Sequence, residues 1–174
     1  QKGLFEQNAE CPCCGWHEET QLHIFQCTHP TIQKTRHNAF KTLEKYYHQH
    51  DIPSSVYIPF TKLCWAACEN KEPTFPGIMD TRITTAILRQ WQLGHDFLLK
   101  GYLTIDWYVA IRAICKDKPD QKLIHLYRGL WTILFDTVWE QRNNFVHGSD
   151  NVAEAYEREI LIDDLTEWKR TSCA

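Results

Sequence analysis

The chain has 174 residues, with 43% hydrophobic, 13% aromatic and 24% charged side chains and a formal net charge of −3 at pH 7. This length suits one medium domain or a small module joined to a helical domain, and glycine and proline, at seven each, disfavour all-β and disordered chains. The small negative charge excludes nucleic-acid binding through bulk positive charge, so such binding would need a local basic patch.

After a polar lead-in, the segment from Cys11 to Cys27 reads CPCCGWHEETQLHIFQC. It has few aliphatic residues, so burial alone supplies too little free energy to order it, and a metal ion is the expected source. Cys11 and Cys14 form a C-P-x-C-G knuckle, and His23 and Cys27 follow one helical turn apart. The spacing Cys-x2-Cys-x8-His-x3-Cys predicts a structural site for one zinc ion. A loop of reduced cysteines and a disulfide pair are the alternatives.

Other side chains in this segment can compete for the ion. His17 and His29 lie close in sequence, but the one-turn spacing of His23 and Cys27 is the better geometry. Cys13 stands too close to its neighbours for a knuckle and is interpreted as a free thiol. A closed set of four ligands leaves no position for water, which argues against a catalytic metal.

Residues 30–50 have the spacing of an amphipathic helix that begins at Pro30. Its apolar face is formed by Ile32, Ala39, Phe40, Leu43 and Tyr47. Another face carries a basic stripe, which consists of Lys34, His37, Lys41, Lys45 and His48. Beside a zinc knuckle such a stripe is a candidate phosphate-contacting surface, and a solvated helix face is the alternative.

Asp51 and Pro53 end that helix, and Pro59 is expected to begin the next one. Cys64 and Cys68 are one helical turn apart within it, but no second pair of ligands stands nearby. Buried thiols are therefore a better interpretation than a second metal site. The proline-bearing run at 69–77 then predicts a domain boundary. Three parts are expected: a zinc module with its lead-in at 1–29, a helical hairpin at 30–72 and a helical bundle at 78–174.

From Asp80 onward nearly every segment has helical spacing. Helices are expected from a cap at Asp80 or Thr81 to Gly94, through Phe97 to Gly101, and from the Thr104 cap to Ile114. A long helix at about 120–147 has so wide an apolar band that it should lie at the centre of the bundle, and a last helix follows at about 152–168. The predicted fold class is mainly α, a small zinc knuckle followed by a helical bundle, with at most a short strand pairing at the knuckle.

The long helix ends in WEQRNNFVHG, which offers a candidate catalytic group in Arg142, Asn143 and His147. An arginine can stabilise charge on phosphorus and a histidine can move protons, so this group could cleave RNA without a metal. The five-residue spacing does not place Arg142 and His147 on one helix face. The alternative is structural, with Arg142 and Asn143 tying down the neighbouring helix and His147 at the helix C-terminus.

Two resemblances arise from these motifs. The run CPCCGWHEETQLHIFQCTHP resembles the zinc-binding segment that follows the polymerase domain in reverse-transcriptase polyproteins of non-LTR retrotransposons. It has the form C-P-x-C-G, acidic residues, T-x-x-H-x-x-x-C, and the resemblance implies that Cys11, Cys14, His23 and Cys27 are the ligands. GHDFLLKGYLTIDW and LWTILFDTVWEQRNNFVHG are similar to the helical tail after that module in elements from algae and other protists. The polymerase itself is missing, so no polymerase activity is implied.

The ending also resembles the R-N-x-x-x-H signature of HEPN-type helical domains, many of which are dimeric ribonucleases. That resemblance implies Arg142, Asn143 and His147 as the catalytic positions. It is a short motif, and a zinc knuckle is not its usual companion.

Three functional hypotheses follow. The first is a non-catalytic, zinc-dependent module that binds RNA or DNA through Lys34, His37, Lys41 and Lys45 within a retroelement-type protein. The second is a metal-independent ribonuclease, and the third is a helical protein-interaction domain with structural zinc. A homodimer through the bundle is a further candidate assembly.

The setting of the chain can also be predicted. Scattered cysteines beside a zinc site indicate reduced thiols and an intracellular compartment, cytoplasmic or nuclear. The sequence contains no apolar run long enough to span a bilayer, so no membrane contact is expected. The chain begins at Gln1, so we expect it to be part of a longer polypeptide.

Overall fold

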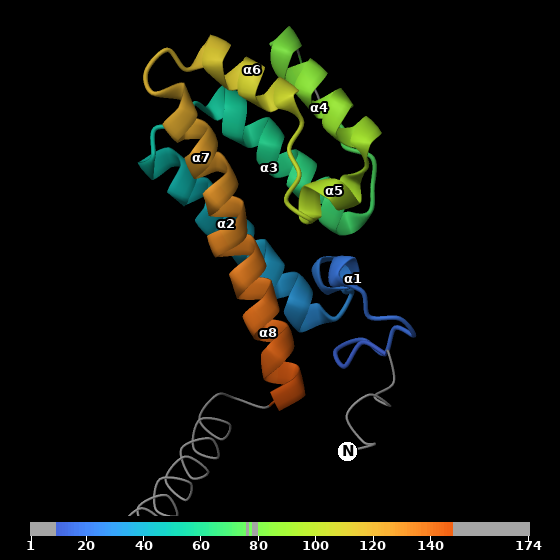
Figure 1. The fold of residues 1–174 in the computed structure, drawn as a ribbon. Coiled ribbons are helices and arrows are strands. Elements are labelled where there is room, and N and C mark those ends of the chain that lie inside the picture. The colour runs from blue at the N-terminus through green and yellow to red at the C-terminus, as the bar shows by residue number, and fades with distance from the viewer. Residues whose placement is uncertain (1–9, 76, 78–79, 148–174) are drawn as a thin grey trace, which may run out of the picture.

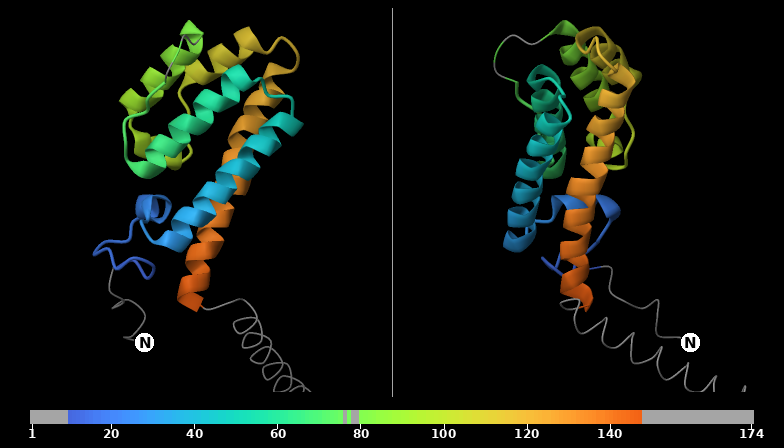
Figure 2. Two further views of the ribbon diagram at one scale, coloured as in Figure 1. Left: turned by 180° about the vertical axis from the view of Figure 1, so that it is seen from behind. Right: turned by 90° about the vertical axis from the view of Figure 1, so that its left-hand side faces the viewer.

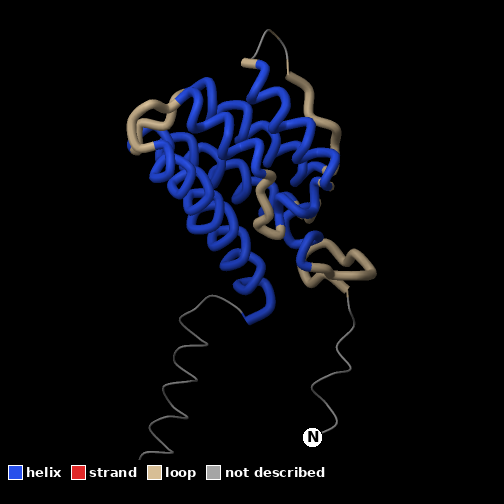
Figure 3. Tube along the Cα trace, turned by 45° about the horizontal axis from the view of Figure 1, so that its top comes forward, coloured by secondary structure: helices blue, strands red, loops and turns tan. Residues whose placement is uncertain are grey.

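A computed structural model of the chain describes residues 10–75, 77 and 80–147, and its ordered elements are helices joined by loops (Figure 1, Figure 3). No strand occurs within these ranges. The prediction of a mainly α fold is therefore confirmed, and the short strand pairing that the sequence allowed beside the knuckle does not occur in the described part. The helix expected at about 152–168 lies outside the described residues.

The elements follow one another in close succession along the chain. They are α1 (Gln21–Gln26), α2 (Pro30–Gln49), α3 (Ser54–Glu69), α4 (Thr81–Leu93), α5 (His95–Leu99), α6 (Ile105–Ile114), α7 (Pro119–Gly129), η1 (Leu130–Phe135) and α8 (Asp136–His147). The long helix expected at 120–147 is thus present, with a π-helical segment, η1, between α7 and α8. None of the described helices is both long and apolar enough to cross a membrane.

This long helix packs lengthwise against α2, and the views of Figure 1 and Figure 2 agree on that arrangement. Gly129 allows the two backbones to approach, because a Cβ atom there would lie 2.8 Å from ring atoms of Tyr46 and of Tyr47. The Tyr47 hydroxyl reaches across and donates a hydrogen bond of 2.6 Å to the Leu126 carbonyl. These contacts fix the register of α2 against α7.

The hairpin partner of α2 is α3, which begins earlier than the sequence suggested. Pro59 does not start this helix but lies inside it, and Val56 is already buried. The turn is set by Pro53, whose carbonyl accepts the N–H groups of Val56 at 2.8 Å and Tyr57 at 3.0 Å. A proline in the second turn forgoes only one intrahelical hydrogen bond, and burial of its neighbours outweighs that loss.

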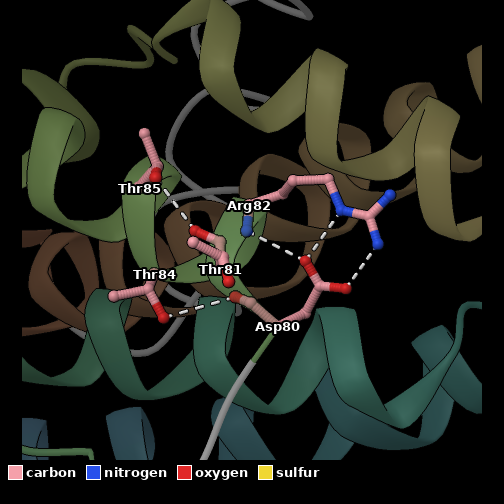
Figure 4. Close-up of polar contacts among 5 residues, drawn as sticks. All are labelled: Asp80, Thr81, Arg82, Thr84 and Thr85. Atoms are coloured by element: carbon pink, nitrogen blue, oxygen red, sulfur yellow. Dashed lines mark hydrogen bonds and ion pairs between the residues drawn. The ribbon is translucent and has the colours of Figure 1, made fainter.

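The second half of the bundle contains α4 and α6, which pack side by side (Figure 1). Figure 4 shows the cap of α4, in which the Asp80 carboxylate accepts hydrogen bonds from the backbone N–H of Arg82 at 2.9 Å and from its guanidinium at 2.8 and 2.6 Å. These bonds lower the pKa of Asp80 to about 2, so the cap stays ionised in mild acid. Of the two predicted caps, Asp80 and Thr81, the structure has Asp80, and Thr81 is the first residue of the helix.

A single cluster of buried apolar side chains runs through the described part. It includes Phe25 from α1, Leu43 from α2, Trp107 from α6 and Leu134 from η1. All five members of the predicted apolar face of α2 are buried, so that face is confirmed. The segment with the four predicted metal ligands therefore packs on the same core as the helices.

Candidate metal centre

The side chains of Cys11, Cys14, His23 and Cys27 converge at one point. Their ligand atoms all lie within 4.8 Å of one another, with 3.9 Å between the sulfurs of Cys11 and Cys27 and 3.3 Å between Cys14 Sγ and His23 Nε2. In a tetrahedral site with Zn–S bonds of about 2.3 Å, two sulfurs lie about 3.8 Å apart. A disulfide requires about 2.05 Å. The group can therefore hold one metal ion, and Cys11 and Cys27 are not bridged to each other.

The knuckle is built by the backbone of Cys11. Its carbonyl accepts the Gly15 N–H at 2.8 Å, and its N–H donates to the Trp16 carbonyl at 2.7 Å. Gly15 has a φ of +73°, in the left-handed region where a side chain is disfavoured. These bonds turn the chain back on itself and bring Cys14 beside Cys11.

The other two ligands are placed by α1. The Thr20 hydroxyl caps this helix by accepting the His23 N–H at 3.1 Å, and Ile24 and Phe25 bury its inner side. Cys27 is the first residue beyond the helix, and it lies buried in the core. One turn of helix thus presents His23 and Cys27 to the same point, as the H-x-x-x-C spacing predicts.

The competing ligands lie elsewhere. His29 caps α2, because its Nδ1 accepts the Thr31 N–H at 3.3 Å, and the ring of His17 packs 4.8 Å from that of Trp16. Cys13 is outside the group, and its pKa is raised to about 11 by burial and by the neighbouring Cys11. Within the described ranges no other group of histidine, cysteine and carboxylate side chains has such an arrangement.

Burial acts on the proton equilibria of the ligands in two directions. It lowers the pKa of His23, so this imidazole is neutral near pH 7 and a ring nitrogen can accept a metal. It raises the pKa of Cys27 well above its ordinary value. Because a metal binds the thiolate, binding at this site must displace the proton of Cys27.

A buried arginine joins the metal segment to α2. Arg36 donates to the carbonyls of Phe25 at 2.5 Å and Cys27 at 3.4 Å, and it is only 5% exposed. These carbonyls lie at the end of α1, where no helical N–H remains to bind them. The sequence contained a signal for this role, because Arg36 falls within the apolar stripe, four residues after Ile32 and four before Phe40.

Arg142 also contacts the metal segment. Its Nε donates to Glu19 Oε1 at 3.0 Å and a terminal nitrogen bonds the other carboxylate oxygen, while a further nitrogen lies 3.4 Å from Asn143 Oδ1. Arg142 therefore holds Glu19, between the knuckle and α1, to α8. His147 is the last residue of α8, and its side chain is outside the description.

The predicted basic stripe lies along one side of α2. Lys34, His37, Lys41 and Lys45 are all exposed to solvent, as is His48. By contrast Cys64 and Cys68 are buried in the core, where burial raises the pKa of Cys68 to about 12. Within the described ranges these two thiols belong to no group of three or more possible metal ligands, so they do not form a second metal site there.

No protein-family model, no curated protein and no solved structure matches the chain.

Proposed function

We propose that the chain is a non-catalytic nucleic-acid-binding module, in which one structural zinc ion fixes the N-terminal segment beside a basic helix, within a retroelement-type, reverse-transcriptase-associated protein. The observation that carries this proposal is the exposed stripe of Lys34, His37, Lys41 and Lys45 on the helix that also anchors the metal segment through Arg36. The helix that carries the basic surface thus also contacts the metal segment.

Zinc is favoured by the chemistry of the ligands. Three cysteines and one histidine are the usual ligands of a structural zinc ion, and soft thiolates do not suit Mg²⁺ or Ca²⁺. Four protein ligands complete a tetrahedral shell and leave no position for a reacting water. The ion is therefore assigned the role of holding the segment in place.

The charge of α2 supports phosphate binding although the whole chain is acidic. Among its residues are three exposed lysines and the buried Arg36, against a single acid, Glu44. Lys34 and Lys45 are eleven positions apart, about 16 Å along a helix. A strip of this length can contact several successive phosphates, and each contact releases condensed counterions.

The test is a salt titration of binding to labelled RNA and DNA oligonucleotides. Changing Lys34, Lys41 and Lys45 together to glutamine should reduce the slope of log K against log salt by about 2 to 3, since each contact contributes about 0.7 to 0.9. The matched control changes Lys100, Lys116 and Lys118, three exposed lysines from the other half of the bundle. Binding without salt dependence, or an equal effect of both triple variants, contradicts the proposal.

The ribonuclease hypothesis is less well supported, because Arg142 is already engaged by Glu19. It requires cleavage of single-stranded RNA in EDTA that is abolished by His147→Ala. If the chain neither cleaves nor binds nucleic acid, the remaining hypothesis is a helical protein-interaction domain that is stabilised by a structural metal ion.

A further inference from the structure

An open groove lies between α2 and α3, beside the basic stripe. Its volume is about 360 Å³, within the range of small-ligand sites of roughly 300–1,000 Å³. Apolar side chains line it from both helices, with Phe40 on α2 and Ile58 and Trp65 on α3. Ile58 is 41% exposed, so the groove presents apolar surface to solvent.

The tryptophan in this groove is held by its neighbours. The ring of Trp65 lies 5.0 Å from that of Phe40 and 5.9 Å from that of His37, both at steep angles, and the Arg36 guanidinium lies 6.0 Å from its centre. Trp65 is only partly buried. It is a fixed aromatic surface that a planar ligand can reach without a large loss of side-chain entropy.

Each of the two helices also contributes a lysine to the lining of the groove. Lys41 extends from α2 and Lys62 from α3, and both are exposed. Neither forms an ion pair within the part of the chain that the structure describes. Glu44 is the one acid at the groove, so two fixed positive charges face one negative charge.

The depression continues along the same seam toward the end of α2. A second hollow of about 420 Å³ adjoins the first at Glu44 and is lined by Lys45, His48 and Tyr57. The two hollows share Glu44, and each is lined by at least one aromatic and one basic side chain. Such a surface suits a ligand that has both planar apolar groups and negative charges.

We propose that this groove binds single-stranded nucleic acid, with a base stacked on Trp65 and neighbouring phosphates on Lys41 and Lys62. The inference rests on the proposed function and specifies the form of the nucleic acid. Single strands expose the faces of their bases, and aromatic side chains in basic grooves bind these faces with little sequence preference. A duplex keeps its bases stacked on one another, so it can use the basic stripe but not Trp65.

The test compares a labelled twelve-residue oligo(dT) with a hairpin duplex of mixed sequence, by fluorescence anisotropy at one salt concentration. Trp65→Leu should weaken binding of the single strand by about 5- to 150-fold and leave binding of the duplex unchanged. The control is Trp139→Leu, which removes another exposed indole that is absent from both hollows. It should leave both affinities unchanged.

Lys62→Gln provides a second variant, because Lys62 is an exposed side chain outside the stripe of α2. It should lower the salt slope for the single strand by about 0.7 without a change in the circular dichroism spectrum. Equal affinities of wild type and Trp65→Leu for the single strand, or an unchanged slope in Lys62→Gln, overturn the groove assignment. If salt-dependent binding persists in that case, the proposed nucleic-acid-binding function stands. If the wild-type protein binds neither oligonucleotide, both the groove assignment and the proposed function are refuted.

Discussion

The ion pair between Glu19 and Arg142 should couple the metal segment energetically to α8. The guanidinium makes two hydrogen bonds to the carboxylate, and the Arg142 and Glu19 side chains are only 21% and 12% exposed. At about 4 Å and an effective dielectric constant of about 20, two unit charges attract by about 4 kcal/mol. Most of this attraction is offset by removing both groups from water. We expect a net coupling of about 1–2 kcal/mol, above the range for exposed pairs.

A double-mutant cycle measures this coupling. Glu19→Gln, Arg142→Met and the double variant are unfolded in urea at pH 7 in the same saturating zinc concentration, so that the folded state of every variant is metal-bound. Each single change should destabilise the protein, and the double change should cost less than the sum of the two. The matched control is the cycle for Glu69 and Lys71, an exposed pair in which the lysine is 71% accessible. Its coupling should stay below about 0.5 kcal/mol.

The outcome separates two roles for Arg142. A coupling near 1–2 kcal/mol with Glu19 fits an arginine that positions the metal segment. A coupling as small as that of the control pair would refute this reasoning and would leave Arg142 available for another role.

Three further predictions concern packing and the metal site. Gly129→Ala should destabilise the fold by about 1–2 kcal/mol in thermal unfolding, because the new Cβ would lie 2.8 Å from ring atoms of Tyr46 and Tyr47. Alanine is intrinsically preferred over glycine in a helix by about 1 kcal/mol, so stabilisation by that amount would show that the helices are not in close contact. Zinc affinity should fall by about tenfold per pH unit for each thiol proton displaced as the pH drops below 7. Burial raises the pKa of Cys27 and lowers that of His23, so the Cys27 thiol should regain its proton before the imidazole does. A zinc-competition assay that shows constant affinity from pH 7 to pH 5.5 would contradict this. Cys27→Ser should lower the bound metal per chain while Cys13→Ser should not, and equal losses would mean that the ligands are misassigned.

Local spacing was informative wherever a local rule decides the structure. The apolar face of α2 and the cap at Asp80 follow from patterns of three to five residues. The structure likewise brings together the two halves of the metal group, each of which is a short local motif.

Features that depend on distant partners were not predicted. The start of α3 at Ser54 depends on burial of Val56 against other helices, which outweighs the preference of Pro59 for a first turn. Gln90 is 1% exposed because its side chain bonds the Tyr102 carbonyl and the Thr104 N–H, both at 2.9 Å. A polar residue on a buried face shows only that a partner is needed and not where in the chain that partner lies. The sequence likewise does not show where the partners of Arg36 and Arg142 lie in the chain.

The most direct test of the metal assignment is elemental analysis of the purified protein combined with a count of reactive thiols before and after chelation. The account predicts one zinc ion per chain and three additional reactive thiols, those of Cys11, Cys14 and Cys27, once the ion is removed. A metal-free protein whose N-terminal segment remains ordered, or one in which these sulfurs are joined as disulfides, would contradict it.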